Sequence, residues 1–255
     1  MATWDPAQYA RFAEARLRPA IDLLARVPAG ERRLVCDLGC GAGQVTRLLA
    51  ERHPGAEIIG VDSSAAMLER ARAAVPAARF LAADIAVWSP PRAADLIVAN
   101  AALHWIEGHD ALMLRLLGGL APRGVLAVQM PRNHAAPSHT AIAETAASGP
   151  WAARLAGVRG TAPVAAAAAY ARRLLPHAAA GGAWESEYVH VLAGPDPVME
   201  WTKGATLRPY LDALGADAPA FLAEYAARLR RAYPPLADGR TLFPFRRVFV
   251  VAVAR

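Results

Sequence analysis

The chain has 255 residues, of which 55% are hydrophobic, 20% charged and 7% aromatic. This composition is typical of a globular protein and excludes disordered, collagen-like and disulfide-scaffold chains. The 28 basic residues include one lysine, Lys203, and they are spread along the sequence singly or in pairs. A net charge of +6 distributed in this way does not favour nucleic acid as a partner, although it allows a local anion pocket.

Two further features bear on location and redox chemistry. Apolar runs such as Val248–Ala254 are far shorter than the ~20 residues that span a bilayer, and Met1–Asp5 carries no basic or apolar leader. We therefore expect a cytoplasmic protein with no membrane partner and no obligate protein partner.

Cys36 and Cys40 have no second Cys or His pair at zinc spacing, so we expect two reduced, packed thiols and no metal.

The first segment predicts a helix. Asp5 is a candidate N-cap, Pro6 fits the first helical position, and Pro19 is expected to break or restart the helix before Val27. From residue 34 onward, short apolar segments alternate with helical ones. Strands are expected at 34–38, 57–62, 79–84, 95–100 and 125–130, and helices at 44–52, at 112–120 and from Ser63 or Ser64 to about Ala74. Repeated strand–helix–strand units predict an α/β fold with a doubly wound, mostly parallel sheet.

The pattern changes after residue 132. Residues 138–180 and 196–233 predict helices, with breaks at Pro209 and Pro219, whereas 184–192 and 248–253 predict strands. We therefore expect residues 1–132 to form an N-terminal helix plus a βαβ core. Residues 133–255 are expected to supply helical cap segments interleaved with the last two strands of the same sheet.

The glycine-rich stretch between the first predicted strand and the next helix carries the chemistry. Asp37 is followed by Gly39, Gly41 and Gly43, whereas the dinucleotide fingerprint would require a glycine at position 44 or 46. The pattern acidic-x-Gly-x-Gly-x-Gly resembles motif I of the class I S-adenosylmethionine-dependent methyltransferases. That resemblance implies a Rossmann-like fold that binds S-adenosylmethionine and releases S-adenosylhomocysteine.

Two further acidic residues follow predicted strands and extend this resemblance. Asp62 stands at the end of the second strand, where a carboxylate can accept both ribose hydroxyls; Ser63 follows it and either assists or caps the helix. The resemblance assigns adenine to Asp84 and Ile85, with Met67 as a second packing partner. The alternatives are a turn cap at Asp84 and core packing at Met67.

The resemblance implies further cofactor contacts at two positions. Asn100, at the end of the fourth strand, would line the methionine part of the cofactor. Asp37 would orient the glycine loop and contact the methionine amino group. Arg16 in the first helix would also contact the cofactor, and that helix, with Tyr9, is either a lid that excludes water or a plain cover for the sheet.

The flanking segments narrow the resemblance to the trans-aconitate methyltransferase family. The segments are Trp4–Pro6, Arg16–Pro19, Asn100–Trp105, Val128–Asn133, Thr206–Tyr210 and Phe245–Phe249. The resemblance implies methyl transfer to a carboxylate of a small polycarboxylic acid, with trans-aconitate as the first choice. Its implied substrate-binding residues are Trp105, Arg132, Arg208 and Arg247.

The implied chemistry needs no catalytic side chain. A carboxylate with a pKa near ~4 is already ionised at neutral pH, so in-line transfer requires positioning rather than a general base. Two alternatives stay open: a methyltransferase of the same class that acts on another small or carrier-bound acceptor, and a non-catalytic regulator that binds S-adenosylmethionine. A hydroxyl acceptor would require a base, for which His104 is the obvious candidate.

Overall fold

The computed structural model describes residues 13–158, 163–204 and 206–255, with side chains from residue 17 onward. These residues belong to two compact units. Of the described residues, the sheet unit comprises 16–131, 164–186 and 247–255, and the helical unit comprises 13–15, 132–158, 163, 187–204 and 206–246. The predicted division of the chain at residue 132 stays a prediction.

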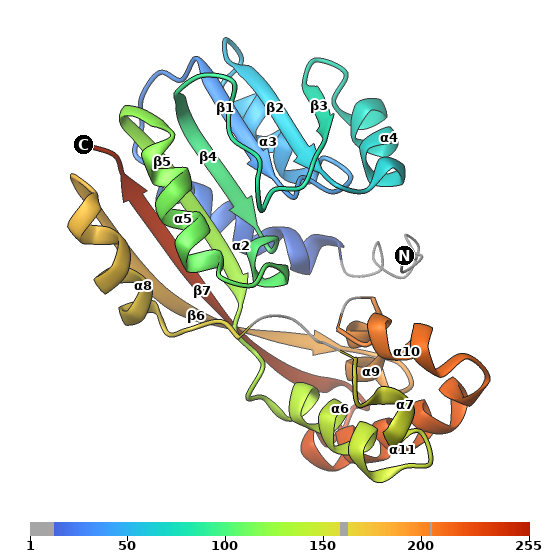
Figure 1. The fold of residues 1–255 in the computed structure, drawn as a ribbon. Helices are drawn as coiled ribbons and strands as arrows, with labels where there is room; N and C mark the ends of the chain where they lie inside the picture. The colour runs from blue at the N-terminus through green and yellow to red at the C-terminus, as the bar shows by residue number, and fades with distance from the viewer. Residues whose placement is uncertain (1–12, 159–162, 205) are drawn as a thin grey trace. The chain divides into compact units, whose positions relative to one another are not determined.

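Seven strands form one mixed sheet (Figure 1). They are β1 (Leu34–Leu38), β2 (Glu57–Asp62), β3 (Arg79–Ala82), β4 (Ala94–Asn100), β5 (Leu120–Pro131), β6 (Ala180–Leu192) and β7 (Thr241–Val253), in the order β3-β2-β1-β4-β5-β7-β6. The pairs β1–β2, β1–β4, β2–β3 and β4–β5 are parallel, and β7 runs antiparallel to β5. The predicted doubly wound, mostly parallel α/β sheet is confirmed.

The carboxyl ends of the parallel strands meet at one edge of the sheet, which is where ligands of such sheets bind. Asp62 and Asn100 are the last residues of β2 and β4, whereas Asp37 lies one residue before the end of β1. The prediction that β3 extends to Asp84 is wrong, because the strand ends at Ala82 and Asp84 begins the following turn.

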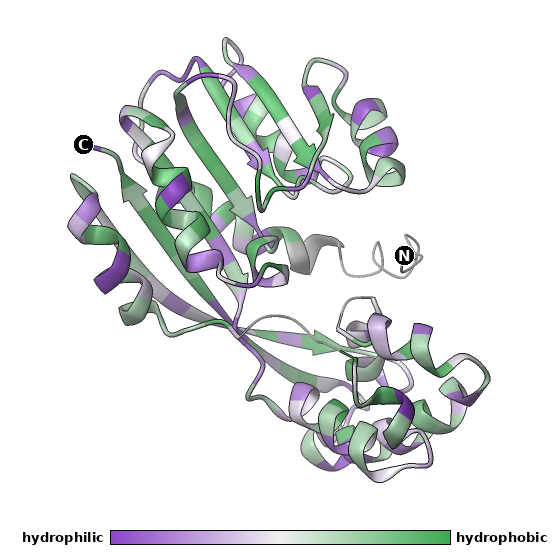
Figure 2. Ribbon diagram, viewed as in Figure 1, coloured by the Kyte–Doolittle hydropathy of each residue, from purple (hydrophilic) through white to green (hydrophobic). Residues whose placement is uncertain are grey.

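Helices cover both faces of the sheet. In the sheet unit they are α2 (Ala13–Ala25), α3 (Gln44–Arg52), α4 (Ala65–Ala74), η1 (Leu103–Trp105), α5 (His109–Gly118), α8 (Ala167–Leu174) and η2 (Leu175–His177). In Figure 1, α2 lies behind the sheet and α5 lies in front of it. All five residues of β1 are buried, and the central strands are predominantly apolar in Figure 2. Burial on both faces explains why these strands have near-continuous apolar sequences.

Several predicted helix boundaries are wrong. Pro19 lies inside α2, which continues to Ala25 because proline removes one backbone donor without forcing the chain to stop. The helix expected at 112–120 begins at His109 and ends at Gly118, since Leu120 pairs with Ala94 at the start of β5. The helical prediction for 138–180 is wrong at residues 149–151, 156–158 and 163–166, which form no helix, and at its end, where Ala180 begins β6. The expected cap residues Asp5 and Pro6 lie outside the described part of the chain.

The remaining helices belong to the helical unit. They are α6 (Pro137–Ser148), α7 (Ala152–Leu155), α9 (Pro197–Lys203), α10 (Arg208–Leu214), η3 (Gly215–Asp217) and α11 (Ala218–Ala232). Pro209 and Pro219 lie in the first turns of α10 and α11, where a missing backbone N–H removes no helical bond. Phe221 and Tyr225 on α11 are fully buried in the apolar core of this unit.

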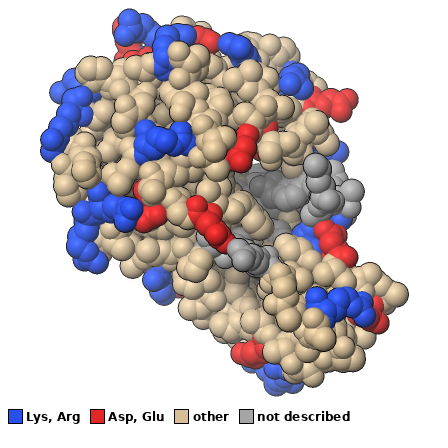
Figure 3. All heavy atoms as spheres, in the orientation of Figure 1, with Lys and Arg blue, Asp and Glu red and all other residues tan. Residues whose placement is uncertain are grey.

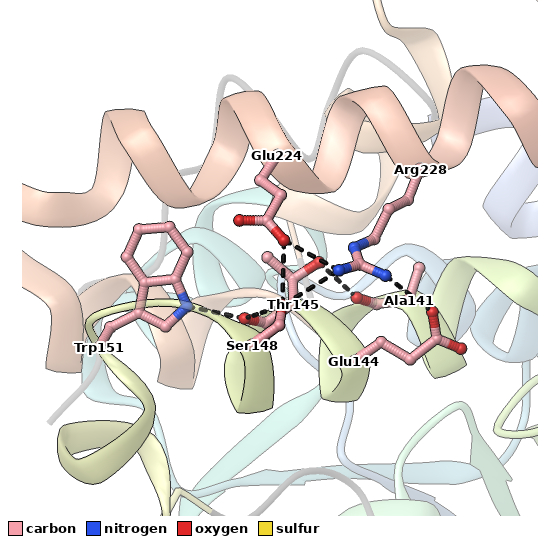
Figure 4. A network of polar contacts seen from close by, with 7 residues as sticks. All are labelled: Ala141, Glu144, Thr145, Ser148, Trp151, Glu224 and Arg228. Atoms are coloured by element: carbon pink, nitrogen blue, oxygen red, sulfur yellow. Dashed lines mark hydrogen bonds and ion pairs between the residues drawn. The ribbon is translucent and has the colours of Figure 1, made fainter.

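A polar network joins α6 to α11 (Figure 4). The Arg228 guanidinium contacts the Glu144 carboxylate at 3.2 Å, the Ser148 hydroxyl at 3.0 Å and the Glu224 carboxylate at 2.9 Å. The hydrogen bonds that Arg228 and the Ser148 hydroxyl donate to the Glu224 carboxylate lower the pKa of Glu224. Trp151 extends the network by donating its indole N–H to the Thr145 carbonyl at 2.7 Å. The network therefore fixes how the two helices pack.

Charged side chains are dispersed on the face shown in Figure 3, where Asp and Glu (red) lie among Lys and Arg (blue). Within the described residues, no helix combines the length and the apolar character that crossing a membrane requires.

Candidate functional site

The loop between β1 and α3 has a backbone that only glycine adopts easily. Gly39, Gly41 and Gly43 all have left-handed φ angles, of 69°, 54° and 85°. A Cβ added at Gly39 would lie 2.4 Å from the Ala102 Cβ, whereas one at Gly41 would meet no atom within 4 Å. Gly39 is therefore required by the packing of the loop against the segment after β4, and Gly41 borders open space.

Asp62 ties the end of β2 to this loop. Its Oδ2 accepts a hydrogen bond from the Gly41 backbone N–H at 2.9 Å, and its Oδ1 accepts one from the Ser64 N–H at 2.9 Å. Each carboxylate oxygen retains a second lone pair. The side chain can therefore hold the loop and still accept two hydroxyl groups of a ligand.

At the start of α4, the residue that caps the helix is Ser64 and not Ser63. Ser64 is the N-cap, and its hydroxyl accepts a hydrogen bond from the Met67 N–H at 3.4 Å. Ser63 is exposed and Met67 is half-buried. Their predicted cofactor contacts stay predictions.

Asp37 is almost completely buried, with 1% of its surface exposed. Its Oδ2 accepts a hydrogen bond from the Thr46 hydroxyl at 2.7 Å, which links β1 to α3 behind the glycine loop. Burial penalises the charged form and raises the pKa of this carboxyl to about 7. The two roles expected for Asp37, orienting the glycine loop and contacting a methionine amino group, stay predictions.

Asp84 and Ile85 follow β3. The Asp84 carboxylate is exposed and accepts a hydrogen bond from the Ala86 N–H at 2.8 Å, so it does cap a local turn. The Ile85 Cδ1 lies 4.0 Å from the position of a Cβ at Gly39. This places an apolar side chain beside the glycine loop, where it is available to a flat ring. The adenine contacts assigned to both residues stay predictions.

A second group of polar residues lies near the ends of β4 and β5 and midway along β7. The buried Oδ1 of Asn100 has no hydrogen-bond partner among the described residues. Gln129 pairs with Asn100 in the strand register and is 0% exposed. Its Oε1 accepts a hydrogen bond from the Arg247 guanidinium at 3.5 Å, and Arg247 is itself 5% exposed.

Gln129 is absent from the residues that the sequence predicts for the site. The sequence nevertheless distinguishes this residue, because Gln129 is the single polar residue in the apolar run from Val125 to Met130. A buried polar side chain at the ligand-binding end of a parallel sheet is a functional candidate.

The other expected acid-binding residues lie in different surroundings. Trp105 in η1 is 48% exposed, with its ring 5.0 Å from that of the buried His104. In the helical unit, the Arg132 backbone N–H donates to the Arg246 carbonyl at 2.8 Å. Arg208 begins α10, and its Nε lies 3.1 Å from the Asp212 carboxylate. The Arg16 side chain and Tyr9 lie outside the described residues, so their expected roles stay predictions.

Within the sheet unit, the structure therefore brings together Gly39, Gly41, Asp62 and Ile85 at the glycine loop. It separately brings Asn100, Gln129 and Arg247 together. The packing of Ala102 against Gly39 connects the two groups, because Ala102 follows Asn100 by two residues.

Comparisons with known proteins agree with this geometry. A family model described as a methyltransferase domain matches residues 35–124, which include the glycine loop and the ends of β2 and β4. Among solved structures, YcgJ from Bacillus subtilis has a TM-score of 0.62 at 14% identity, over 93% of this chain and 99% of that one. NodS from Bradyrhizobium japonicum, an N-methyltransferase in complex with S-adenosylhomocysteine, has a TM-score of 0.50 at 16% identity, over 95% of this chain and 87% of that one. Both likenesses show the fold.

Two relatives are far more similar in sequence. The trans-aconitate 2-methyltransferase of Azoarcus sp. (strain BH72) is 52% identical over 254 residues, which cover 99% of this chain and 100% of that protein. The protein of the same name from Streptomyces avermitilis is 50% identical over 260 residues, covering 98% of this chain and 96% of that protein. Both alignments include both compact units. The chain belongs to the trans-aconitate 2-methyltransferase family.

Proposed function

We propose that this chain transfers a methyl group from S-adenosylmethionine to one carboxylate of trans-aconitate, which gives a monomethyl ester. The observation that carries the proposal is the 52% identity to a trans-aconitate 2-methyltransferase over nearly the entire chain. A match limited to the glycine loop and the strand ends would support only the reaction class, whereas this one includes the segments that carry the expected acid-binding residues.

The residues present in the sheet unit fit the cofactor. Asp62 retains acceptor capacity for two ribose hydroxyls, and Gly41 leaves open space beside that carboxylate. The half-buried Ile85 offers an apolar contact for adenine, and the unpartnered Asn100 Oδ1 offers an acceptor for an ammonium group. S-adenosylmethionine supplies, when bound, a methyl group made electrophilic by its sulfonium.

The protein has two tasks in this reaction. It must hold a carboxylate oxygen in line with the methyl carbon, which removes orientational freedom from the barrier. It must also supply positive charge for a substrate with several carboxylates, and arginine suits this because its guanidinium is always protonated and binds carboxylates in a bidentate manner. We assign this second task to Arg208 and Arg247, with Arg132 and Trp105 as further contacts.

The direct test is incubation of the protein with S-adenosylmethionine and a panel of mono-, di- and tricarboxylic acids, followed by mass spectrometry of the products. Formation of a trans-aconitate monomethyl ester with the highest kcat/KM in the panel supports the proposal. Methylation of non-acid acceptors alone overturns the substrate, and cofactor binding without turnover on any acid overturns the enzymatic assignment.

Variants test the arginines. We expect R208Q and R247Q each to raise the KM for trans-aconitate and to leave the affinity for S-adenosylmethionine unchanged. R92Q is a matched control, because Arg92 lies just before β4 at the opposite edge of the sheet, in an exposed ion pair with Glu57 at 2.7 Å. Equal KM values for R208Q, R247Q and R92Q would remove the arginines from the substrate site.

A further inference from the structure

We propose that Gln129 is a positioning residue for the acid substrate: it orients the guanidinium of Arg247 through a neutral contact that adds no negative charge beside it. The inference rests on the proposed function, in which Arg247 binds the acid, and it adds a residue that the sequence analysis did not assign.

The strand register explains why the two side chains meet. On β7, Phe249 pairs with Gln129, and Arg247 pairs with Pro131. Paired residues direct their side chains to the same face of a sheet, and so do residues two positions apart on one strand. Arg247 and Gln129 therefore lie on one face, at the end of β5 where the ligand edge lies.

The chemistry of the two groups fixes the orientation of the amide. A guanidinium has only donors, so the Gln129 carboxamide must present its oxygen to Arg247, and the structure places Oε1 at 3.5 Å from the Arg247 Nη1. The amide nitrogen is consequently directed away from Arg247. It has no hydrogen-bond partner among the described residues.

A neutral partner suits a guanidinium that must bind an anion. A carboxylate at position 129 would form an ion pair with Arg247, and in a buried setting that pair would be strongly favoured. The negative charge of that carboxylate would offset the positive charge of Arg247, which is the charge that attracts the substrate. A carboxamide restrains the arginine through a single weak bond and adds no negative charge.

The neighbouring strand connects this pair to the expected cofactor site. Asn100, directly opposite Gln129 in the register, has an unpartnered buried oxygen, and Gln129 has an unpartnered buried N–H group. Gln129 thus lies between the residue expected to line the methionine moiety and the residue expected to bind the acid. This arrangement suits a residue that aligns one reactant with the other.

The experiment compares Q129E and Q129M with the wild type in steady-state assays with trans-aconitate. Q129E keeps the size and the acceptor but adds a charge, and we expect its KM for the acid to rise roughly tenfold or more, because the new carboxylate competes with the substrate for Arg247. Q129M removes the acceptor without adding a charge, and we expect a smaller rise in KM. The dissociation constant for S-adenosylhomocysteine should be unchanged in both variants.

A double-mutant cycle separates positioning from a general structural role. In an R247Q background, the additional effect of Q129E on KM should disappear, because Gln129 acts through Arg247. A purely structural role predicts instead a lower melting temperature and a lower kcat in both single variants, with KM unchanged. That result, or an equal effect of Q129E with and without Arg247, overturns the inference.

The wild-type reaction in the same assay distinguishes the two proposals. Absence of ester formation by the wild type overturns the proposed function and the role of Gln129 together. Wild-type turnover combined with an unchanged KM in both Q129E and Q129M overturns the role of Gln129 alone. Should Q129E fail to fold, Q129M and its pairing with R247Q still decide the question.

Discussion

Asp62 accepts the backbone N–H of Gly41 at 2.9 Å, so a carboxylate at the end of β2 holds the middle of the glycine loop that follows β1. The same carboxylate accepts the Ser64 N–H at the start of α4. One side chain therefore fixes the loop, the end of a strand and the beginning of a helix. These contacts give the carboxylate a structural role in addition to the ribose contact proposed for it.

The D62N substitution tests this double role. An asparagine presents an NH2 group to one of two backbone N–H donors, so one of the two hydrogen bonds must be lost. We expect the affinity for S-adenosylhomocysteine to fall roughly ten- to hundredfold, as is usual for the loss of bonds to a charged group. Isothermal titration calorimetry measures this change. D238N, in the turn before β7, should bind as the wild type does, and equal affinities for D62N and D238N would contradict the assignment.

Two glycines of the same loop should respond differently to alanine. Both have positive φ angles, which cost a non-glycine residue about 1–2 kcal/mol. G39A also creates an overlap with Ala102, so we expect its unfolding free energy to fall by about 2–4 kcal/mol. The Cβ of G41A enters open space, so we expect a smaller loss of stability but weaker cofactor binding.

Denaturant unfolding and calorimetry with S-adenosylhomocysteine measure the two effects on the same samples. Wild-type affinity in G41A would show that the space beside Asp62 does not hold the cofactor. Similar losses of stability in the two variants would show that the contact between Gly39 and Ala102 is unimportant.

The buried Asp37 carboxyl predicts a pH dependence of stability. Burial raises its pKa to about 7, above the value of about 3.9 in unfolded chains. The folded state therefore binds this proton more tightly than the unfolded state does. We expect the contribution of Asp37 to the unfolding free energy to be greatest below pH ~4 and to decline as the pH rises through about 7.

D37N removes this titration, because its side chain is neutral at every pH and still offers an oxygen to Thr46. Urea unfolding of the cofactor-free protein between pH 5 and pH 8 should show a smaller loss of stability at high pH for D37N than for the wild type. D22N on α2, which removes a surface carboxylate paired with Arg18, should retain the wild-type slope. A slope for D37N equal to that of the wild type would exclude Asp37 as its source.

His104 distinguishes a carboxylate acceptor from a hydroxyl acceptor. A general base typically contributes about 10²–10⁴ to the rate, so a reaction that needs none should keep its kcat within roughly tenfold in H104F. The substitution preserves an aromatic ring against Trp105. A loss of a hundredfold or more, accompanied by a changed pH–rate profile, would favour an acceptor that must be deprotonated.

Sequence periodicity predicted the first two strands to the residue, because both are short, apolar and bounded by charged residues or glycine. It did not predict that β3 ends before Asp84, since the hydrogen bonds that make Asp84 a turn residue involve backbone groups. The α2 helix continues through Pro19 because packing of its apolar face outweighs one missing hydrogen bond. Helix propensity in the alanine-rich region likewise could not indicate where β6 begins, because its extended conformation depends on pairing with β7.

The candidate site was predictable where a residue type and its position at a strand end both point to a ligand, as at Asp62. It was not predictable at Gln129. The meaning of that residue depends on β7, a strand more than one hundred positions away, which brings Arg247 beside it. Antiparallel register between distant strands leaves no periodic signal in the sequence.

The position of β7 has a consequence for biosynthesis. This strand comes after all the others in the chain, yet it lies between β5 and β6 in the sheet. During translation, β5 keeps an open hydrogen-bonding edge, and β6 has no neighbour, until residues 241–253 have left the ribosome. The nascent chain therefore exposes an apolar edge of β5 until the last strand has been made, so the sheet is completed only after nearly the whole chain has left the ribosome.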